Sequence, residues 1–365
     1  QTEMDYTNEF GFVNVDALCD KDEGIKRLAL VREQSAQHHF HHWELAFADL
    51  FVDHGGFDLN VGNPPWIKVE WNEGGILGDY DPLFVIRNTS ATQMSKLREK
   101  AIEMRGSRDA YLDEYITFDG MQNFLNAHQN YSILEGSKAN LYKCFLPQAW
   151  YIGSVQGITG FLHPEGVYDD PYGGLFRQEI YPRLKFHFQF QNELKLFGDV
   201  GHVIKFSINI QTTIKSKNVK FSHISNLYTV STIDGCFNFN SSITYSGVKD
   251  ENNQWNITGH PDRIICIDES ILDMFKNLYD EVATPTLQAR LPIVHVNKIV
   301  NVLNKITLHE KKFNSIKKFY FSTQHWNETN AQQDGTIKAG NQFARKAEEL
   351  ILCGPHFYIA NPLYK

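Results

Sequence analysis

The sequence predicts an α/β fold followed by a region of mixed structure. A short apolar strand at residues 57–62 runs directly into two prolines, and helical and strand patterns alternate between residues 140 and 210. From about residue 216 the chain changes to polar strand-like segments separated by turns rich in Asn, Ser, Thr and Gly. These observations divide the 365 residues into a first region, residues 1–215, and a second region, residues 216–365.

The prolines after the first strand belong to residues 56–66, which read Gly-Phe-Asp-Leu-Asn-Val-Gly-Asn-Pro-Pro-Trp. Proline fixes its φ angle and has no amide hydrogen, so the strand must stop at Asn63. The side-chain oxygen of Asn63 and the carbonyl of Pro64 can accept both N–H bonds of an exocyclic amine while Trp66 stacks on its ring. Such an arrangement suits methyl transfer to the amine. An ordinary proline turn is the competing interpretation.

This stretch, together with residues 43–51 (Trp-Glu-Leu-Ala-Phe-Ala-Asp-Leu-Phe), resembles the large bacterial DNA adenine methyltransferases of restriction-modification and phage-defence systems. The resemblance implies the later part of a Rossmann-like class I methyltransferase sheet, followed by a target-recognition region. It implies S-adenosyl-L-methionine as cofactor, a flipped adenine in double-stranded DNA as substrate, and other subunits of a defence system as partners. Catalytic roles are implied for Asn63, Pro64, Pro65 and Trp66, and cofactor contacts for Trp43, Glu44 and Asn63.

Later segments extend the resemblance. Residues 140–145 (Asn-Leu-Tyr-Lys-Cys-Phe) and 157–165 (Gly-Ile-Thr-Gly-Phe-Leu-His-Pro-Glu) are similar to the helix and the strand that follow the catalytic loop in this family. Residues 192–197 and 205–207 resemble the segment that supplies a second aromatic ring to the target adenine. This implies Phe206 first and Phe197 second as partners of Trp66 in stacking on the base. A role for either phenylalanine in the core alone is about as well supported.

Residues 67–138 have the character of an insertion. Residues 92–105 and 109–128 combine charged residues with apolar residues at helical spacing, which predicts two amphipathic helices. An exposed hairpin whose apolar face packs on the core is the simpler interpretation. A lid over the flipped base, or a clamp on the DNA backbone, is the functional one.

One expected feature is missing from the sequence. A class I methyltransferase carries a glycine-rich loop after its first strand and an acidic residue for the ribose. Gly11 and Gly24 do not form such a loop, and Gly55 and Gly56 come too late. We expect the cofactor-binding half to precede residue 1 or to lie in another chain. Two alternatives stay open: a DNA-recognition subunit without catalysis, and a methyltransferase acting on protein glutamine or RNA.

Composition limits the other functions. Four histidines lie close together at 38, 39, 41 and 42, but no carboxylate or cysteine joins them at a ligand spacing, so we expect no metal site. The five cysteines are scattered, which supports neither disulfides nor zinc and favours a cytoplasmic location. No apolar run approaches the length of a membrane helix. We therefore expect no membrane partner.

The second region contains the strongest basic and aromatic patch. The net charge of −8 gives DNA binding no general support, so any basic contact must be local. Four lysines alternate with aromatic residues and are the predicted DNA contacts: Lys311, Lys312, Lys317 and Lys318. Solvated lysines around a strand are the common alternative. Strands are predicted at residues 221–230, 236–245, 255–258 and 263–267, and a helix at 293–306.

Overall fold

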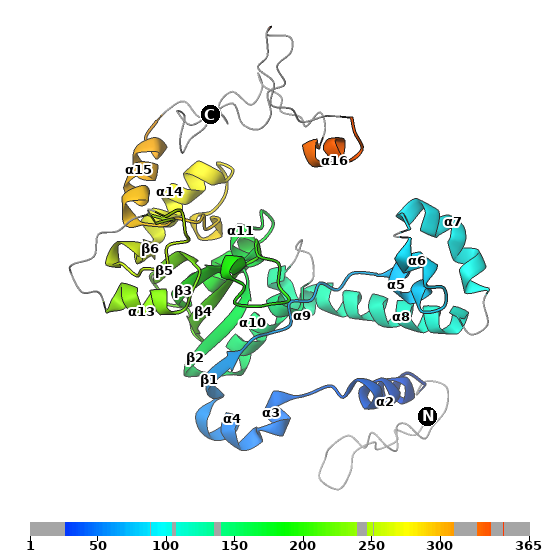
Figure 1. The fold of residues 1–365 in the computed structure, drawn as a ribbon. Helices are drawn as coiled ribbons and strands as arrows, with labels where there is room; N and C mark the ends of the chain where they lie inside the picture. Colours follow the sequence, from blue (N-terminus) through cyan, green and yellow to red (C-terminus); the bar gives the residue numbers. More distant parts are fainter. Residues whose placement is uncertain are drawn as a thin grey trace. The chain divides into compact units, whose positions relative to one another are not determined.

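The computed structural model describes residues 26–87, 89–103, 107–134, 140–238, 247–250, 252–309, 327–336 and 346. By its internal contacts the chain forms two compact units, residues 1–308 and 309–365. The described part of the second unit contains one helix, α16 (Glu328–Gln333). The β-sheet and the helices packed on it belong to the first unit (Figure 1).

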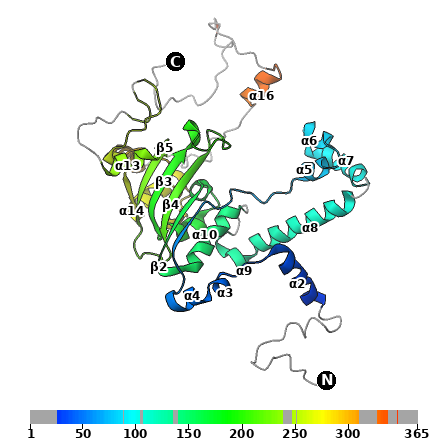
Figure 2. The same ribbon diagram turned by 60° about the horizontal axis from the view of Figure 1, so that its bottom comes forward.

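A six-stranded mixed sheet is the centre of this unit. Its strands are β1 (Phe57–Gly62), β2 (Gly153–Pro164), β3 (Leu184–Gln191), β4 (Lys205–Thr212), β5 (Lys220–Leu227) and β6 (Ile265–Asp268). Their order is β1-β2-β4-β3-β5-β6, in which β1 is parallel to β2 and β3 to β5, while the other neighbours are antiparallel. Figure 2 shows the four central strands, β2, β4, β3 and β5, side by side. The predicted α/β class is confirmed.

One face of the sheet is covered by helices. These are α10 (Leu141–Ile152), α11 (Gly166–Asp169), α12 (Gly174–Ile180) and α14 (Glu269–Tyr279). Their apolar side chains form the main core with strand residues such as Phe161, and Leu146, Ile180 and Phe275 have no exposed surface. Burial of this kind stabilises the fold by roughly 1.5–3 kcal/mol for each large side chain.

The other face is covered unevenly. A smaller core forms at the carboxyl end of β2, where Phe190 and Phe206 pack with Cys236 from α13 (Ser231–Phe237). At the β1 edge the same face is open, because Leu59 and Val61 keep 64% and 74% of their surface exposed.

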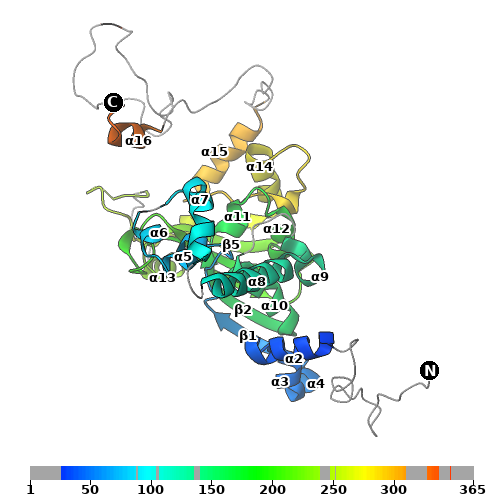
Figure 3. The ribbon, with the colours of Figure 1, turned by 90° about the vertical axis from the view of Figure 1, so that its right-hand side faces the viewer.

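Two glycines, Gly55 and Gly56, form the connection between α4 and β1. Helices α3 (Trp43–Ala46) and α4 (Ala48–His54) precede the strand (Figure 3), and α4 ends at Gly55 in the left-handed conformation. Gly56 has a φ of 136°, and a Cβ atom there would lie 2.5 Å from the carbonyl oxygen of Ile152. Only glycine permits this approach, which places β1 beside β2.

The insertion is helical, as predicted. Its helices are α5 (Glu73–Gly78), α6 (Leu83–Ile86), α7 (Ala91–Ile102), α8 (Ser107–Asn126) and α9 (His128–Tyr131). Helices α7 and α8 match the two predicted amphipathic helices to within a few residues. The long α8 runs between α9 at one end and α5–α7 at the other (Figure 1).

The two ends of the insertion meet beside the Asn-Pro-Pro-Trp sequence. The backbone N–H of Leu141 donates a hydrogen bond to the carbonyl oxygen of Ile67 at 3.0 Å. The segment leaving the loop is also tied to α8, since the Trp71 ring packs edge-on against Tyr111 and Tyr115 at 5.4 and 5.3 Å. The insertion therefore starts and finishes beside the residues for which catalysis was predicted.

The sheet does not end at residue 215. Strand β3 pairs with β5 and β5 with β6, so residues up to 268 complete the same sheet, and the compact unit ends at Leu308. The domain boundary predicted after residue 215 therefore falls between two strands of one sheet. Pairing with β5 satisfies the backbone hydrogen-bonding groups of β3, which would otherwise form an open sheet edge. The recognition role of residues 216–365 stays a prediction.

Two of the predicted later strands are corrected. In place of a strand beginning at Cys236, α13 continues to Phe237, and residues 239–246 lie outside the described part of the chain. Thr232 and Cys236 are buried four residues apart, which is a helical spacing. Residues 255–258 contribute only a single bridge, between Trp255 and Lys249. The helix predicted at 293–306 is α15 (Asn297–Thr307), and α2 (Lys26–His38) lies near the amino terminus.

Candidate active site

The loop of residues 63–66 begins at the end of β1. Strands β1 and β2 are parallel, with Gly62 beside Phe161. The 63–66 loop and the segment after β2 therefore leave the sheet at the same end of the strands. Pro64 is buried, whereas Asn63 is exposed. The Asn63 side chain makes no hydrogen bond with another residue that the structure describes. Its amide group is therefore available to a ligand.

A pocket of about 300 Å³ lies beside this loop. Its walls come from β1, β2, the 63–66 loop, α10 and α3, and include the aromatic side chains Trp43, Phe145 and Phe161. Polar groups enter it from Asn60, Asn63 and Gln148. A largely apolar pocket with a few convergent polar groups is the usual form of a small-molecule site.

Of the two residues predicted before β1, only Trp43 lies on the wall of this pocket. The exposed carboxylate of Glu44 instead accepts a hydrogen bond from the hydroxyl of Tyr151, at the end of α10. This hydrogen bond raises the pKa of Tyr151. A direct contact between Glu44 and the cofactor stays a prediction.

The three predicted stacking residues form one aromatic cluster. The ring centroids of Trp66 lie 5.8 Å from Phe206 and 6.0 Å from Phe197, and those of Phe197 and Phe206 are 5.1 Å apart. Trp66 also donates a 3.4 Å hydrogen bond to the carbonyl oxygen of Leu162. Phe206 is only 2% exposed. The rings pack directly against one another, so a base between Trp66 and Phe206 requires them to separate.

Asn192 holds Phe197 in this cluster. Its side-chain Nδ2 donates to the carbonyl oxygens of Phe197 and Val200 at 2.9 and 2.7 Å, and its Oδ1 accepts from the Phe197 N–H at 3.0 Å. The Asn192 side chain is completely buried. Three hydrogen bonds from one side chain therefore shape the connection between β3 and β4 that carries Phe197.

The pocket and the aromatic cluster lie on opposite faces of the sheet. Phe161, which lines the pocket, belongs to the main core, whereas the side chains of Trp66 and Leu162 pack against the smaller core, and successive strand residues point to opposite faces. None of Trp66, Phe197 and Phe206 is among the described residues that line the pocket. Asn63 lines the pocket and lies in the same loop as Trp66.

A layer of buried ionisable groups, missed in the sequence analysis, lies on the face that carries Phe161. His187 contacts the Glu165 carboxylate at 3.0 Å and the Nδ1 atom of His223 at 2.7 Å. Burial alone would raise the pKa of Glu165, but the charge and hydrogen bond of His187 lower it. Burial also lowers the pKa of His163 to about 4 and that of His223 well below its usual value. The alternating polar residues in β2, β3 and β4 were the available signal.

The histidine cluster and the predicted DNA-contacting lysines do not form a site among the described residues. The four histidines around residue 40 lie at the end of α2 and in the segment before α3, and no group of three or more His, Cys, Asp or Glu side chains among the described residues suits a metal ion. Lys311, Lys312, Lys317 and Lys318 lie outside the described residues. No described helix is long and apolar enough to cross a membrane.

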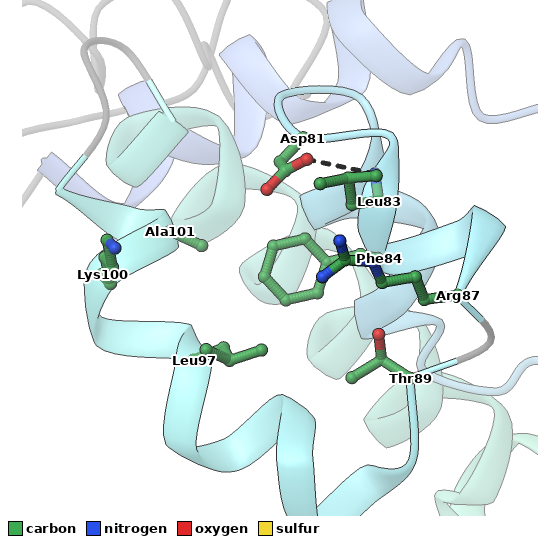
Figure 4. A pocket seen from close by; sticks show the side chains of 8 residues that line it. All are labelled: Asp81, Leu83, Phe84, Arg87, Thr89, Leu97, Lys100 and Ala101. Carbon is green, nitrogen blue, oxygen red and sulfur yellow. Dashed lines mark hydrogen bonds between the residues drawn. The ribbon is translucent and has the colours of Figure 1, made fainter.

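A second pocket, of about 170 Å³, lies within the insertion (Figure 4). The Phe84 ring of α6 faces Leu97 and Ala101 of α7, and the Asp81 carboxylate accepts a 3.0 Å hydrogen bond from the Leu83 N–H. No residue of the 63–66 loop lines it. It is a gap in the small core of the insertion.

No protein-family model and no curated protein matches this chain. Among solved structures, it is similar to a type I restriction-modification methyltransferase subunit from Streptococcus thermophilus, at 17% identity and a TM-score of 0.26, over 50% of this chain and 31% of that one. A DNA-bound ATP-dependent type ISP restriction-modification enzyme, LlaBIII, matches at 14% identity and a TM-score of 0.24, over 46% of this chain and 10% of that one. A structure from an assembled type I restriction-modification system matches at 10% identity and a TM-score of 0.29, over 78% and 46%. The chain spans less than half the length of each.

Proposed function

We propose that this chain is the catalytic part of a DNA adenine methyltransferase that uses S-adenosyl-L-methionine in restriction-modification or phage defence. The observation that carries the proposal is the position of Asn63, whose exposed side chain follows the end of a parallel strand, lines a pocket and lies in the same loop as Trp66 of the aromatic cluster. The sequence resemblance supplies the reaction class. Double-stranded DNA and further subunits are the proposed partners.

In this proposal Asn63 and Pro64 act on the target amine. The Oδ1 atom of Asn63 and the carbonyl oxygen of Pro64 accept its two N–H bonds, which directs the nitrogen lone pair away from the ring. Pro65 keeps the loop rigid. Trp66 stacks on the base, with Phe206 or Phe197 on the other side once the cluster opens. The acidified proton leaves to water, so no strong base is required.

The residues of the pocket fit part of the cofactor. Trp43, Pro65 and Phe145 provide apolar surfaces for a flat ring, and Asn60 provides a buried side-chain donor. When bound, S-adenosyl-L-methionine supplies an electrophilic methyl group on its sulfonium. The glycine-rich loop expected in this class is not among residues 1–62.

The test is transfer of labelled methyl groups to DNA. Asn63→Ala removes one of the two acceptors of the amine, so we expect methylation to fall by at least 100-fold with unchanged thermal stability. Asn301→Ala, on an exposed position of α15, is the matched control and should retain activity. Full methylation by the Asn63 variant would contradict the assignment. Label in protein or RNA, with none in DNA, would favour the other substrate classes, and DNA binding without any transfer would favour a recognition subunit.

A further inference from the structure

A row of three polar side chains crosses the sheet from the pocket inward. Asn60 of β1 lies beside Thr159 of β2, and Thr159 lies beside Gln211 of β4. Each carries a buried polar atom without a hydrogen-bond partner among the described residues: Asn60 Nδ2, Thr159 Oγ1 and Gln211 Nε2. Thr159 and Gln211 have no exposed surface, whereas Asn60 is half-buried and lines the pocket.

Three unpaired polar atoms in one row are costly for a folded protein. An unsatisfied buried donor or acceptor typically costs about 1–3 kcal/mol, and native interiors contain few of them. Gln211 is fixed in orientation, because its Oε1 accepts a 2.8 Å hydrogen bond from the Trp150 indole. Only Asn60 has access to a ligand, so the Asn60 amide is the member of the row that a bound molecule can satisfy.

The pocket defines the chemistry of that molecule. Aromatic and proline surfaces, with Trp43, Pro65 and Phe145 among them, suit a flat ring, and an amide N–H requires an acceptor on the edge of that ring. Ring nitrogens of a purine are such acceptors. Because Nδ2 is itself buried, a contact with the ring requires rotation of the Asn60 side chain.

We propose that Asn60 is a specificity-determining residue for the cofactor and that its Nδ2 donates a hydrogen bond to a ring nitrogen of the cofactor's adenine. This inference rests on the proposed function, because it takes S-adenosyl-L-methionine as the ligand of the pocket. It predicts that Asn60 lowers the stability of the free protein, because its buried donor is unpaired until the cofactor binds.

Two substitutions separate binding from stability. Asn60→Leu removes the unpaired donor and replaces it with apolar volume, so the melting temperature should rise by a few degrees while affinity for S-adenosyl-L-methionine and for adenosine falls about tenfold. Asn60→Asp keeps the shape but buries a carboxylate, so the melting temperature should fall, and affinity should again drop at least tenfold because the donor is lost. The same two changes at Asn301 are the controls.

Isothermal titration with S-adenosyl-L-methionine and with adenosine, together with thermal melts, decides the question. Loss of affinity in both variants, with melting temperatures that move in opposite directions, supports the proposal. Affinity that follows the melting temperature, or that is unchanged in both variants, overturns it and indicates that the row is structural or hydrated. If the unsubstituted chain binds neither ligand, the cofactor assignment itself fails, which is a distinct result.

Discussion

The pocket and the aromatic cluster, both of which include residues of the 63–66 loop, differ in whether space for a ligand is open. On one side, a pocket of about 300 Å³ is open, with exposed Asn63 and a half-buried Asn60 on its wall. On the other side, Trp66, Phe197 and Phe206 are in direct contact. A ligand can enter the pocket directly. On the aromatic side, a base can enter only if the contacts among the three rings are replaced by contacts with the base. The pocket would therefore accept a ligand with no more than side-chain rotation, whereas the aromatic side would accept a base only after its rings separate.

The largest expected effect is on the packed side. Phe206→Ala should lower the free energy of unfolding by about 3–5 kcal/mol, because the ring is 2% exposed and stacks on Phe190 at 5.4 Å. Denaturant titration measures this change. Phe186 of the neighbouring strand β3 lies on the same face of the sheet but is 36% exposed, so Phe186→Ala should lower the free energy of unfolding clearly less. Equal costs would show that the cluster is not specially packed.

The buried ionisable groups on the sheet face that carries Phe161 should make the free energy of unfolding depend on pH. The pKa of His163 is about 4 in the folded protein and ordinarily near 6.5, so the stability from its neutral form is complete above pH 6.5 and is lost as the pH falls toward 4. His223 shifts in the same direction. We expect the free energy of unfolding at pH 5 to be about 2 kcal/mol below its value at pH 7.5 for His163 alone.

Urea titrations at both pH values test this effect. His163→Gln removes the titrating group and should flatten the pH dependence by about that amount, whereas His54→Gln, at an exposed position of α4, should leave it unchanged. An identical pH dependence in the His163 variant would contradict the interpretation. The three rings of the aromatic cluster carry no titrating group and should not contribute.

The smallest effect on stability is expected on the pocket side. Phe145 is 44% exposed on α10, so Phe145→Ala should cost less than about 1.5 kcal/mol, yet it should weaken binding of S-adenosyl-L-methionine severalfold because a pocket wall is lost. Phe237→Ala, at a position of α13 that is 49% exposed and outside the pocket lining, is the matched control. A large loss of stability with unchanged binding would reverse the distinction between the two sides.

Local patterns predicted much of this architecture. The prolines at 64 and 65 ended β1 where expected, and periodicity located α7, α8, α10 and the central strands. The later region was harder, since polar segments such as residues 236–245 have weak periodicity. Strand β5 joins the sheet by pairing with β3, and β6 by pairing with β5, and no local pattern reveals either pairing.

The sequence by itself determined the class of fold and the rigid loop with Asn63 at a strand end, because proline chemistry and hydrophobic periodicity act on neighbouring residues. Only the tertiary structure decided that Trp43 and Phe145 share a pocket, that Trp66 meets Phe206, and that Asn60, Thr159 and Gln211 form a row. These residues are brought together by strand register and by helix packing. Both are set by the burial of whole faces and not by any short segment of the chain.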